Sequence, residues 1–157
     1  MTDYIVCDCM LGKLARMLRI LGYVVYYDST ADDTKLLQIS KKYNAILLTR
    51  DLELSKLYSK AVYVSSHDIR EQLKYALKVL DSLNLRPAMK PMETCPECGT
   101  PIIPCDREYI KGNYYESTYC TYNTFYFCPN CKKVYWEGYQ YRNLIRTLKD
   151  LEDKAIT

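Results

Sequence analysis

AILLTRD, at residues 45–51, is the stretch that decides the fold class of this 157-residue chain. From Ala45 to Thr49 the chain forms a short apolar run, which the charged pair Arg50 and Asp51 closes. Apolar side chains at consecutive positions are typical of a strand that is buried on both faces, as in a parallel sheet covered by helices. We therefore predict a fully buried strand here, with an acidic residue at its carboxyl end.

Strand-like and helix-like stretches alternate on both sides of this run. Clusters of β-branched and aromatic residues predict further strands at residues 4–7, 24–27 and 61–64. Helical spacing of apolar residues predicts helices at residues 10–21 and 52–59, and between them a second helix whose apolar residues run from Leu36 to Tyr43. A longer helix begins after Ser66 or Asp68 and runs to about residue 83. Repeated strand–helix order with short connections predicts an α/β fold, whose mostly parallel sheet is covered on both faces.

The composition changes after a predicted linker at residues 84–93, which holds Pro87 and Pro91 and shows no periodicity. We expect the chain to divide there into an α/β domain, residues 1–86, and a cysteine-rich domain, residues 87–157. Apolar residues at helical spacing near the end of the chain predict that the second domain closes with a helix.

Four cysteines in the second domain have the spacing of a zinc site. Cys95 and Cys98 form one C-x-x-C turn, and Cys128 and Cys131 form another. Each turn lets two thiolates approach one ion, and two turns complete a tetrahedral shell of sulfur, which suits Zn²⁺. Because no coordination position remains for water, we expect a structural zinc ion that folds a small β-rich ribbon.

Two further cysteines, Cys105 and Cys120, lie between the two zinc turns. They are expected either to pair with each other or to remain thiols, and the sequence does not decide between these states. Disulfides are rare in the cytoplasm, where we expect the protein because its N-terminus lacks the pattern of a signal peptide. No apolar stretch approaches the roughly 18 residues of a membrane span, so we expect no membrane contact.

Three aspartates occupy positions where a parallel sheet gathers ligands. Asp8 ends the first predicted strand, Asp33 opens the second helix, and Asp51 ends the third strand. If strands one and three are neighbours, these residues converge at the carboxyl edge of the sheet, and clustered carboxylates need a cation such as Mg²⁺ or Mn²⁺. The alternative is that Asp33 and Asp51 are helix N-caps, and the residues alone leave both interpretations open.

Basic residues follow the first of these aspartates. Lys13, Arg16 and Arg19 recur every three residues along the first helix, where they form either an RNA-binding stripe or a solvated face. Arg50 either contributes to RNA binding or pairs with a carboxylate. The net charge of the chain is only +3, so composition by itself says little about a nucleic-acid partner.

Four stretches of the chain resemble the Mut-seven C-terminal RNase domain family. They are DCMLGKLARMLRILGY at residues 8–23, DTKLL at residues 33–37, LLTRD at residues 47–51 and, after the second zinc turn, VYWEG at residues 134–138. They fall in the order of the family and cover nearly the whole chain. The resemblance implies a PIN-like parallel sheet sandwiched by helices, followed by a small zinc ribbon and a C-terminal helix.

The same resemblance implies a metal-dependent ribonuclease that hydrolyses RNA phosphodiester bonds, with Asp8, Asp33 and Asp51 as catalytic ligands of Mg²⁺ or Mn²⁺. PIN-like nucleases often carry a fourth acid, and Glu53, Asp32 and Asp68 are the candidates. The alternative function is a non-catalytic adaptor that keeps the PIN-like fold and binds RNA or protein. The sequence does not indicate an oligomeric state.

Overall fold

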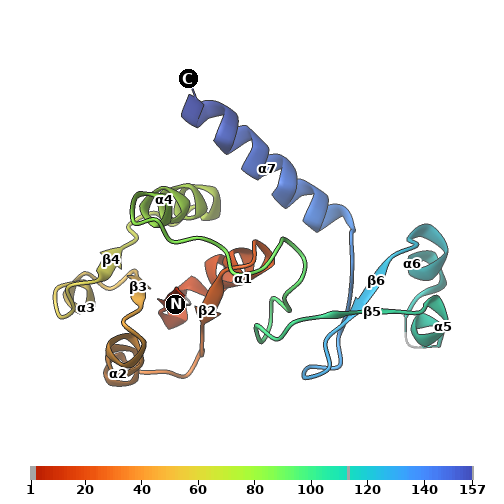
Figure 1. The fold of residues 1–157 in the computed structure, drawn as a ribbon, viewed down its shortest axis with the longest axis horizontal. Coiled ribbons are helices and arrows are strands. Elements are labelled where there is room, and N and C mark those ends of the chain that lie inside the picture. The colour runs from red at the N-terminus through yellow and green to blue at the C-terminus, as the bar shows by residue number, and fades with distance from the viewer. Residues whose placement is uncertain (1–2, 113, 157) are drawn as a thin grey trace. The chain divides into compact units, whose positions relative to one another are not determined.

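The computed structural model of the protein describes residues 3–112 and 114–156. The chain folds into two compact units, Met1–Gly99 and Thr100–Thr157 (Figure 1). The division falls after Gly99, and the predicted domain boundary after residue 86 stays a prediction. Of the helices that the structure describes, none is both long and apolar enough to cross a membrane.

The first unit is built on a sheet of four parallel strands in the order β2-β1-β3-β4. The strands are β1 (Tyr4–Cys7), β2 (Val24–Tyr26), β3 (Ile46–Thr49) and β4 (Ala61–Tyr63). All four residues of β3 are buried, as the apolar run predicts. Because β1 lies between β2 and β3, the strand order reverses at β1, and a parallel sheet gathers ligands at such a point.

Helices follow each strand and cover both faces of this sheet (Figure 1). They are the short 3₁₀ helix η1 (Cys9–Leu11), α1 (Gly12–Ile20), α2 (Asp33–Tyr43), α3 (Leu52–Ser55) and α4 (Ile69–Ser82). Helix α1 packs against α4, while α2 lies on the opposite face of the sheet. The α/β architecture is confirmed, although the helix predicted at residues 52–59 ends earlier, at Ser55.

The core of the first unit forms on both sides of the strands. On one face, Val6 of β1 and Leu47 of β3 pack with Leu36 of α2 and Leu54 of α3. Successive side chains of a strand point to opposite faces, so Cys7, which is also fully buried, belongs to the other face. This two-sided burial explains why the strands lack the polar alternation of a half-exposed sheet.

The end of α1 is held against the segment that leads to the first zinc turn. The backbone N–H groups of Ala88 and Met89 both donate to Gly22 O, at 3.0 and 3.1 Å, and Met92 N donates to Ile20 O at 2.9 Å. Residues 84–93 thus contain no helix or strand, as predicted, but they are hydrogen-bonded to the helix end.

Gly22 is required at this position for two reasons. Its φ of +96° lies in the left-handed region that glycine adopts without strain. In addition, a Cβ atom added to Gly22 would lie 1.9 Å from Met89 O.

The second unit contains a three-stranded antiparallel sheet in the order β5-β6-β7. Its elements are β5 (Ile103–Cys105), α5 (Arg107–Ile110), α6 (Glu116–Thr121), β6 (Phe125–Phe127), β7 (Val134–Trp136) and α7 (Tyr139–Ile156). Ile110, Phe125 and Val134 form its small core, with aromatic residues such as Trp136 packed around them. The small antiparallel sheet expected of a ribbon and the C-terminal helix are confirmed.

We predict that Gly22→Ala lowers the free energy of unfolding by about 2 kcal/mol or more, since alanine meets both the left-handed backbone and the Met89 carbonyl. Gly112→Ala is the matched control, because Gly112 has a φ of +89° but no atom within 4 Å of an added Cβ. Urea unfolding followed by circular dichroism measures both variants. Equal losses in the two would show that the close approach of Met89 contributes nothing.

Candidate functional site

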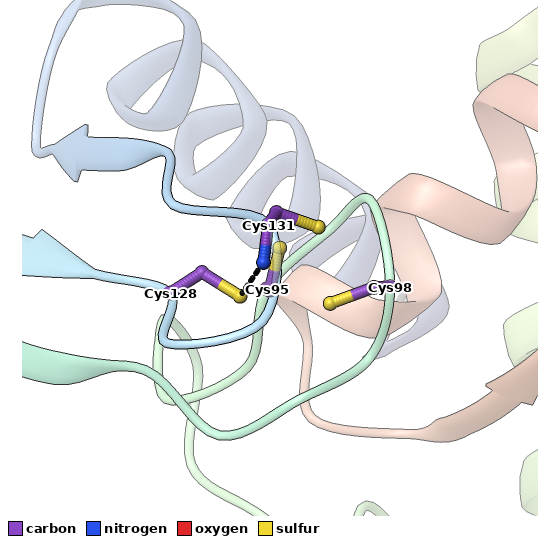
Figure 2. Close-up of side chains that lie close together, drawn as sticks. All are labelled: Cys95, Cys98, Cys128 and Cys131. Carbon is purple, nitrogen blue, oxygen red and sulfur yellow. Dashed lines mark hydrogen bonds between the residues drawn. The ribbon is translucent and has the colours of Figure 1, made fainter.

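The four cysteines of the two C-x-x-C turns lie together (Figure 2). The ligand atoms of Cys95, Cys98, Cys128 and Cys131 are all within 4.8 Å of one another. Each turn is closed by a backbone hydrogen bond: Gly99 N donates to Cys95 O at 2.8 Å, and Lys132 N donates to Cys128 O at 2.9 Å. In the second turn Cys131 N also donates to the Cys128 sulfur at 3.3 Å.

This donor set fits a zinc ion. A tetrahedral centre with Zn–S bonds of about 2.3 Å needs four sulfur atoms that are close to one another, and no other ligand. Cys95 and Cys128 are buried while Cys98 and Cys131 are partly exposed. The four residues are therefore the ones that could hold zinc, as their spacing predicts.

Asp8 is a buried carboxylate at the carboxyl end of β1, with only 4% of its surface exposed. Its Oδ1 accepts a hydrogen bond from Met10 N at 2.9 Å, which caps η1. Its Oδ2 accepts from the Thr49 hydroxyl and from Arg50 N, the latter at 2.8 Å. Three donors compensate the burial of the charge, since a buried carboxylate is stable only when it is hydrogen-bonded.

Thr49 connects Asp8 to Asp51 across the neighbouring ends of β1 and β3. Its hydroxyl donates to Asp8 Oδ2 and accepts from Asp51 N at 2.9 Å. Asp51 in turn caps α3, because its Oδ1 accepts from the backbone N–H groups of Glu53 and Leu54. The second carboxylate oxygen of Asp51 accepts no hydrogen bond from the described residues.

The other predicted acids also lie at the starts of helices. Asp32, not Asp33, is the N-cap of α2, with its Oδ1 accepting from Lys35 N at 2.8 Å. Asp33 is therefore exposed in the first turn, and the described part of the chain offers its carboxylate no hydrogen bond. Asp68 caps α4, and Glu53 is exposed and paired with Lys56 at 3.2 Å.

The aspartates do not form a compact metal-binding group as the cysteines do. Among residues 3–112 and 114–156, the four cysteines are the one group of three or more His, Cys, Asp or Glu side chains that is placed to hold a metal ion. Asp8 and Asp51 share one edge of the sheet and are joined through Thr49. The metal-ligand roles of Asp8, Asp33 and Asp51 stay predictions.

The basic residues of α1 have three different environments. Lys13 is exposed, whereas Arg16 pairs with Glu97 of the first zinc turn at 2.7 Å. Arg19 is buried, with 4% of its surface exposed, and its guanidinium donates to backbone carbonyls. A phosphate would therefore find an exposed cation at Lys13 but not at Arg19.

Arg50 is half-buried and its side chain is directed along the loop after β4. Its guanidinium donates to Ser65 O at 3.3 Å and lies 3.1 Å from His67 Nε2. Because a guanidinium only donates, this nitrogen of His67 accepts the hydrogen bond. Arg50 makes no ion pair with a carboxylate in the described part of the chain, although its backbone N–H donates to Asp8.

The cysteines outside the zinc turns are thiols in the structure. Cys7, directly before Asp8, is fully buried, and burial together with the neighbouring carboxylate raises the pKa of its thiol far above the usual range. Cys7 is therefore protonated and unsuited to act as a nucleophile. Cys9 is exposed, while Cys105 lies on β5 and Cys120 on α6.

A comparison with known families identifies the chain. The sequence model described as the Mut7-C RNAse domain matches residues 3–148. The chain belongs to the Mut7-C RNase domain family. No curated protein and no solved structure matches the chain.

The part of the chain that matches the Mut7-C family model contains both sets of residues. The matched region includes the aspartates at the carboxyl edge of the sheet as well as all four cysteines. An RNase domain suggests a nuclease with RNA as its substrate, and the cysteine cluster is the part of this Mut7-C domain that could bind zinc.

Two residues with structural roles at these sites were not recognised from the Mut7-C sequence. Thr49 is the last residue of β3, and its hydroxyl contacts Asp8 and the backbone of Asp51. Its position directly before Arg50 and Asp51 is the only sequence signal for this role. For Arg19 the sequence predicts either an RNA-binding stripe or a solvated helix face, but its side chain is buried.

We predict that Cys98→Ser and Cys128→Ser each lower the zinc content of the purified protein and destabilise residues 95–157 before the N-terminal half of the chain. Removing one thiolate leaves an incomplete shell, and zinc binding contributes to folding. Elemental analysis measures the metal, with Cys120→Ser as the control because Cys120 is exposed and outside the cluster. Unchanged zinc stoichiometry in both ligand variants would refute the assignment.

We predict that Thr49→Val lowers the free energy of unfolding by about 2 kcal/mol, because it removes a donor to a buried carboxylate and the acceptor of Asp51 N. The matched control is Thr94→Val, since the buried Thr94 hydroxyl has no hydrogen-bond partner within the described residues. The control should be neutral or stabilising in the same urea titration. Equal effects of the two changes would contradict the bridging role of Thr49.

Proposed function

We propose that the protein is a metal-dependent endoribonuclease whose acidic site lies at the carboxyl ends of β1 and β3. One observation carries the proposal: in a chain of an RNase domain family, the Thr49 hydroxyl links the Asp8 carboxylate to the backbone of Asp51. The strand order reverses at β1, which is where open parallel sheets bind their ligands.

Each aspartate would have a distinct part in this site. Asp8 is fixed by three donors and would provide a rigid negative charge at the base of the site. Asp51 has one oxygen left after capping α3, and Asp33 has its whole carboxylate available. Mg²⁺ or Mn²⁺ bound by these groups would activate water and stabilise the charge that develops at phosphorus.

Two basic residues that follow Asp8 or precede Asp51 in the sequence are the proposed RNA contacts. Lys13 lies in the first turn of α1, which follows η1 and Asp8, and its side chain is exposed. Arg50 lies between Thr49 and Asp51, and its guanidinium contacts Ser65 O and His67 but pairs with no carboxylate of the described residues. We assign phosphate binding to these two residues, with Arg16 secondary because it already pairs with Glu97.

The zinc centre has a structural role in this proposal. Four thiolates leave no ligand position for water or substrate, so hydrolysis is assigned to the aspartates. Because the thiols must remain reduced to bind zinc, we expect the protein to act in a reducing compartment such as the cytoplasm.

One observation favours the rival function, a non-catalytic adaptor that binds RNA or protein. The carboxylates of Asp8, Asp32, Asp51 and Asp68 all accept backbone N–H groups at helix starts, so each also has a purely structural use. An adaptor would bind RNA with a salt-dependent affinity but would not cleave it at any concentration of Mg²⁺ or Mn²⁺.

We predict that Asp51→Asn abolishes metal-dependent RNA cleavage, with a loss of roughly two orders of magnitude or more in rate. Asparagine is as good an N-cap as aspartate, so the helix start should be preserved while the charge is removed. The assay uses zinc-loaded protein and mixed single-stranded RNAs, with and without added Mn²⁺, and the melting temperature is measured in parallel.

Asp33→Asn should give the same loss, and Asp81→Asn is the control because Asp81 is an exposed acid in the last turn of α4 that pairs with Arg86. Asp8→Asn is expected to lose activity as well as stability, since an amide NH₂ would oppose the donors on Asp8 Oδ2. Wild-type cleavage that persists unchanged in Asp51→Asn and Asp33→Asn would exclude this site. RNA binding without any cleavage would establish the adaptor.

A further inference from the structure

The guanidinium of Arg19 is the best-connected charged group in the first unit that the proposed reaction does not use. Its Nε and Nη2 donate to Val25 O of β2, at 3.1 and 2.9 Å. Its Nη1 donates to Pro96 O at 3.1 Å and to Glu97 O at 2.9 Å. The Arg19 guanidinium is thus fixed by β2 and also binds the carbonyls of Pro96 and Glu97.

These two carbonyls belong to the residues between Cys95 and Cys98. The conformation of a C-x-x-C turn decides whether its two thiolates face the same ion, and that conformation is described by the peptides of the two intervening residues. By binding both carbonyls at once, Arg19 fixes those peptides in the orientation that the structure shows. The planar fork of a guanidinium suits this task, since its donors diverge at fixed angles.

The chain that enters the turn is fixed by the same end of α1. Met92 N donates to Ile20 O, and Ala88 and Met89 donate to Gly22 O. The backbone of residues 20–22 therefore holds the approach to the turn, and the side chain of Arg19 holds the turn itself.

Charge gives a second reason to place an arginine here. A zinc ion with four thiolates carries a net charge of about −2, and a buried anionic centre is stabilised by a nearby cation. Burial lowers the pKa of Arg19, while the negative charges of the Cys98 and Cys95 thiolates and of the Glu97 carboxylate act in the opposite direction. An arginine keeps its positive charge in such a site.

We propose that Arg19 is a positioning residue of the zinc centre, which holds the first C-x-x-C turn in its metal-binding conformation and offsets the charge of the loaded site. The inference concerns zinc binding and is independent of the proposed nuclease function. It replaces the role in RNA binding that the sequence suggested for Arg19.

The test compares the zinc affinities of full-length variants by competition with a chromophoric chelator. Arg19→Met removes the donors and the charge but keeps an unbranched apolar chain, and Arg19→Lys keeps the charge but not the fork. Both should bind zinc about tenfold more weakly or worse, the range expected for partners that orient metal ligands. Arg16→Met is the matched control, because Arg16 contacts the same turn only through an exposed ion pair with Glu97.

A spectroscopic measurement separates positioning from general destabilisation. With Co²⁺ in place of Zn²⁺, the ligand-field bands of Arg19→Met should differ from those of the wild type, whereas Arg16→Met should reproduce them. Zinc affinity and Co²⁺ spectra that are the same in Arg19→Met and Arg16→Met would overturn the proposal.

If Arg19→Met does not fold, hydrogen exchange of the wild-type protein tests whether the end of α1 and the first C-x-x-C turn are coupled. Removing zinc should speed exchange at the amides of Leu21, Gly22 and Tyr23, whose hydrogen bonds end α1, as well as in the cysteine turns. Amides between β3 and β4 serve as the internal reference. Faster exchange in the cysteine turns alone, with the end of α1 unchanged, would overturn the proposal.

Discussion

The buried carboxylate of Asp8 is the constraint on which the acidic edge of the sheet depends. A carboxylate that is 4% exposed is stable only with donors on both oxygens, and these come from Met10, Thr49 and Arg50. Thr49 is the last residue of β3 and Arg50 follows it, so satisfying Asp8 requires β1 and β3 to be neighbours in the observed register. The same contacts bring the start of α3, and therefore Asp51, to the end of β1.

Helix α1 connects this acidic edge to the metal-binding turn. After Asp8 the chain forms η1 and then α1. Near the end of α1, Arg19 binds the carbonyls of Pro96 and Glu97. Asp8 is a buried carboxylate before this helix and belongs to the acidic edge of the sheet. Arg19 is a buried cation near the end of the helix and binds the first C-x-x-C turn. This arrangement separates a proposed hydrolytic site, which needs open ligand positions, from a structural zinc centre, which needs none.

The strands, the helices and the cysteine cluster could be predicted from the sequence, because the periodicity of apolar residues depends on burial and the spacing of cysteines depends on ligand geometry. The run at residues 45–49 became β3, and the two C-x-x-C turns became the cysteine cluster. The spacing could not show which aspartate caps α2, since Asp32 and Asp33 differ by one position. The three-residue spacing of Lys13, Arg16 and Arg19 also suggested a single exposed face, which is wrong for Arg19. In an α-helix each residue turns by about 100°, so side chains three positions apart differ in direction by about 60°. Arg19 therefore lies roughly 120° from Lys13, on the buried side of the helix.

The chemistry of the cleaved RNA ends tests the central claim most directly. The account assigns the attack on phosphorus to water at an acidic, metal-dependent site, and such hydrolysis leaves a 5′-phosphate and a 3′-hydroxyl when the bond to the 3′ oxygen breaks. Zinc-loaded protein with Mn²⁺ should produce these ends, also from RNA with a 2′-deoxy sugar at the cleavage position. A 2′,3′-cyclic phosphate, or cleavage that stops with the 2′-deoxy sugar, would contradict the account, since both results require the 2′-hydroxyl as nucleophile.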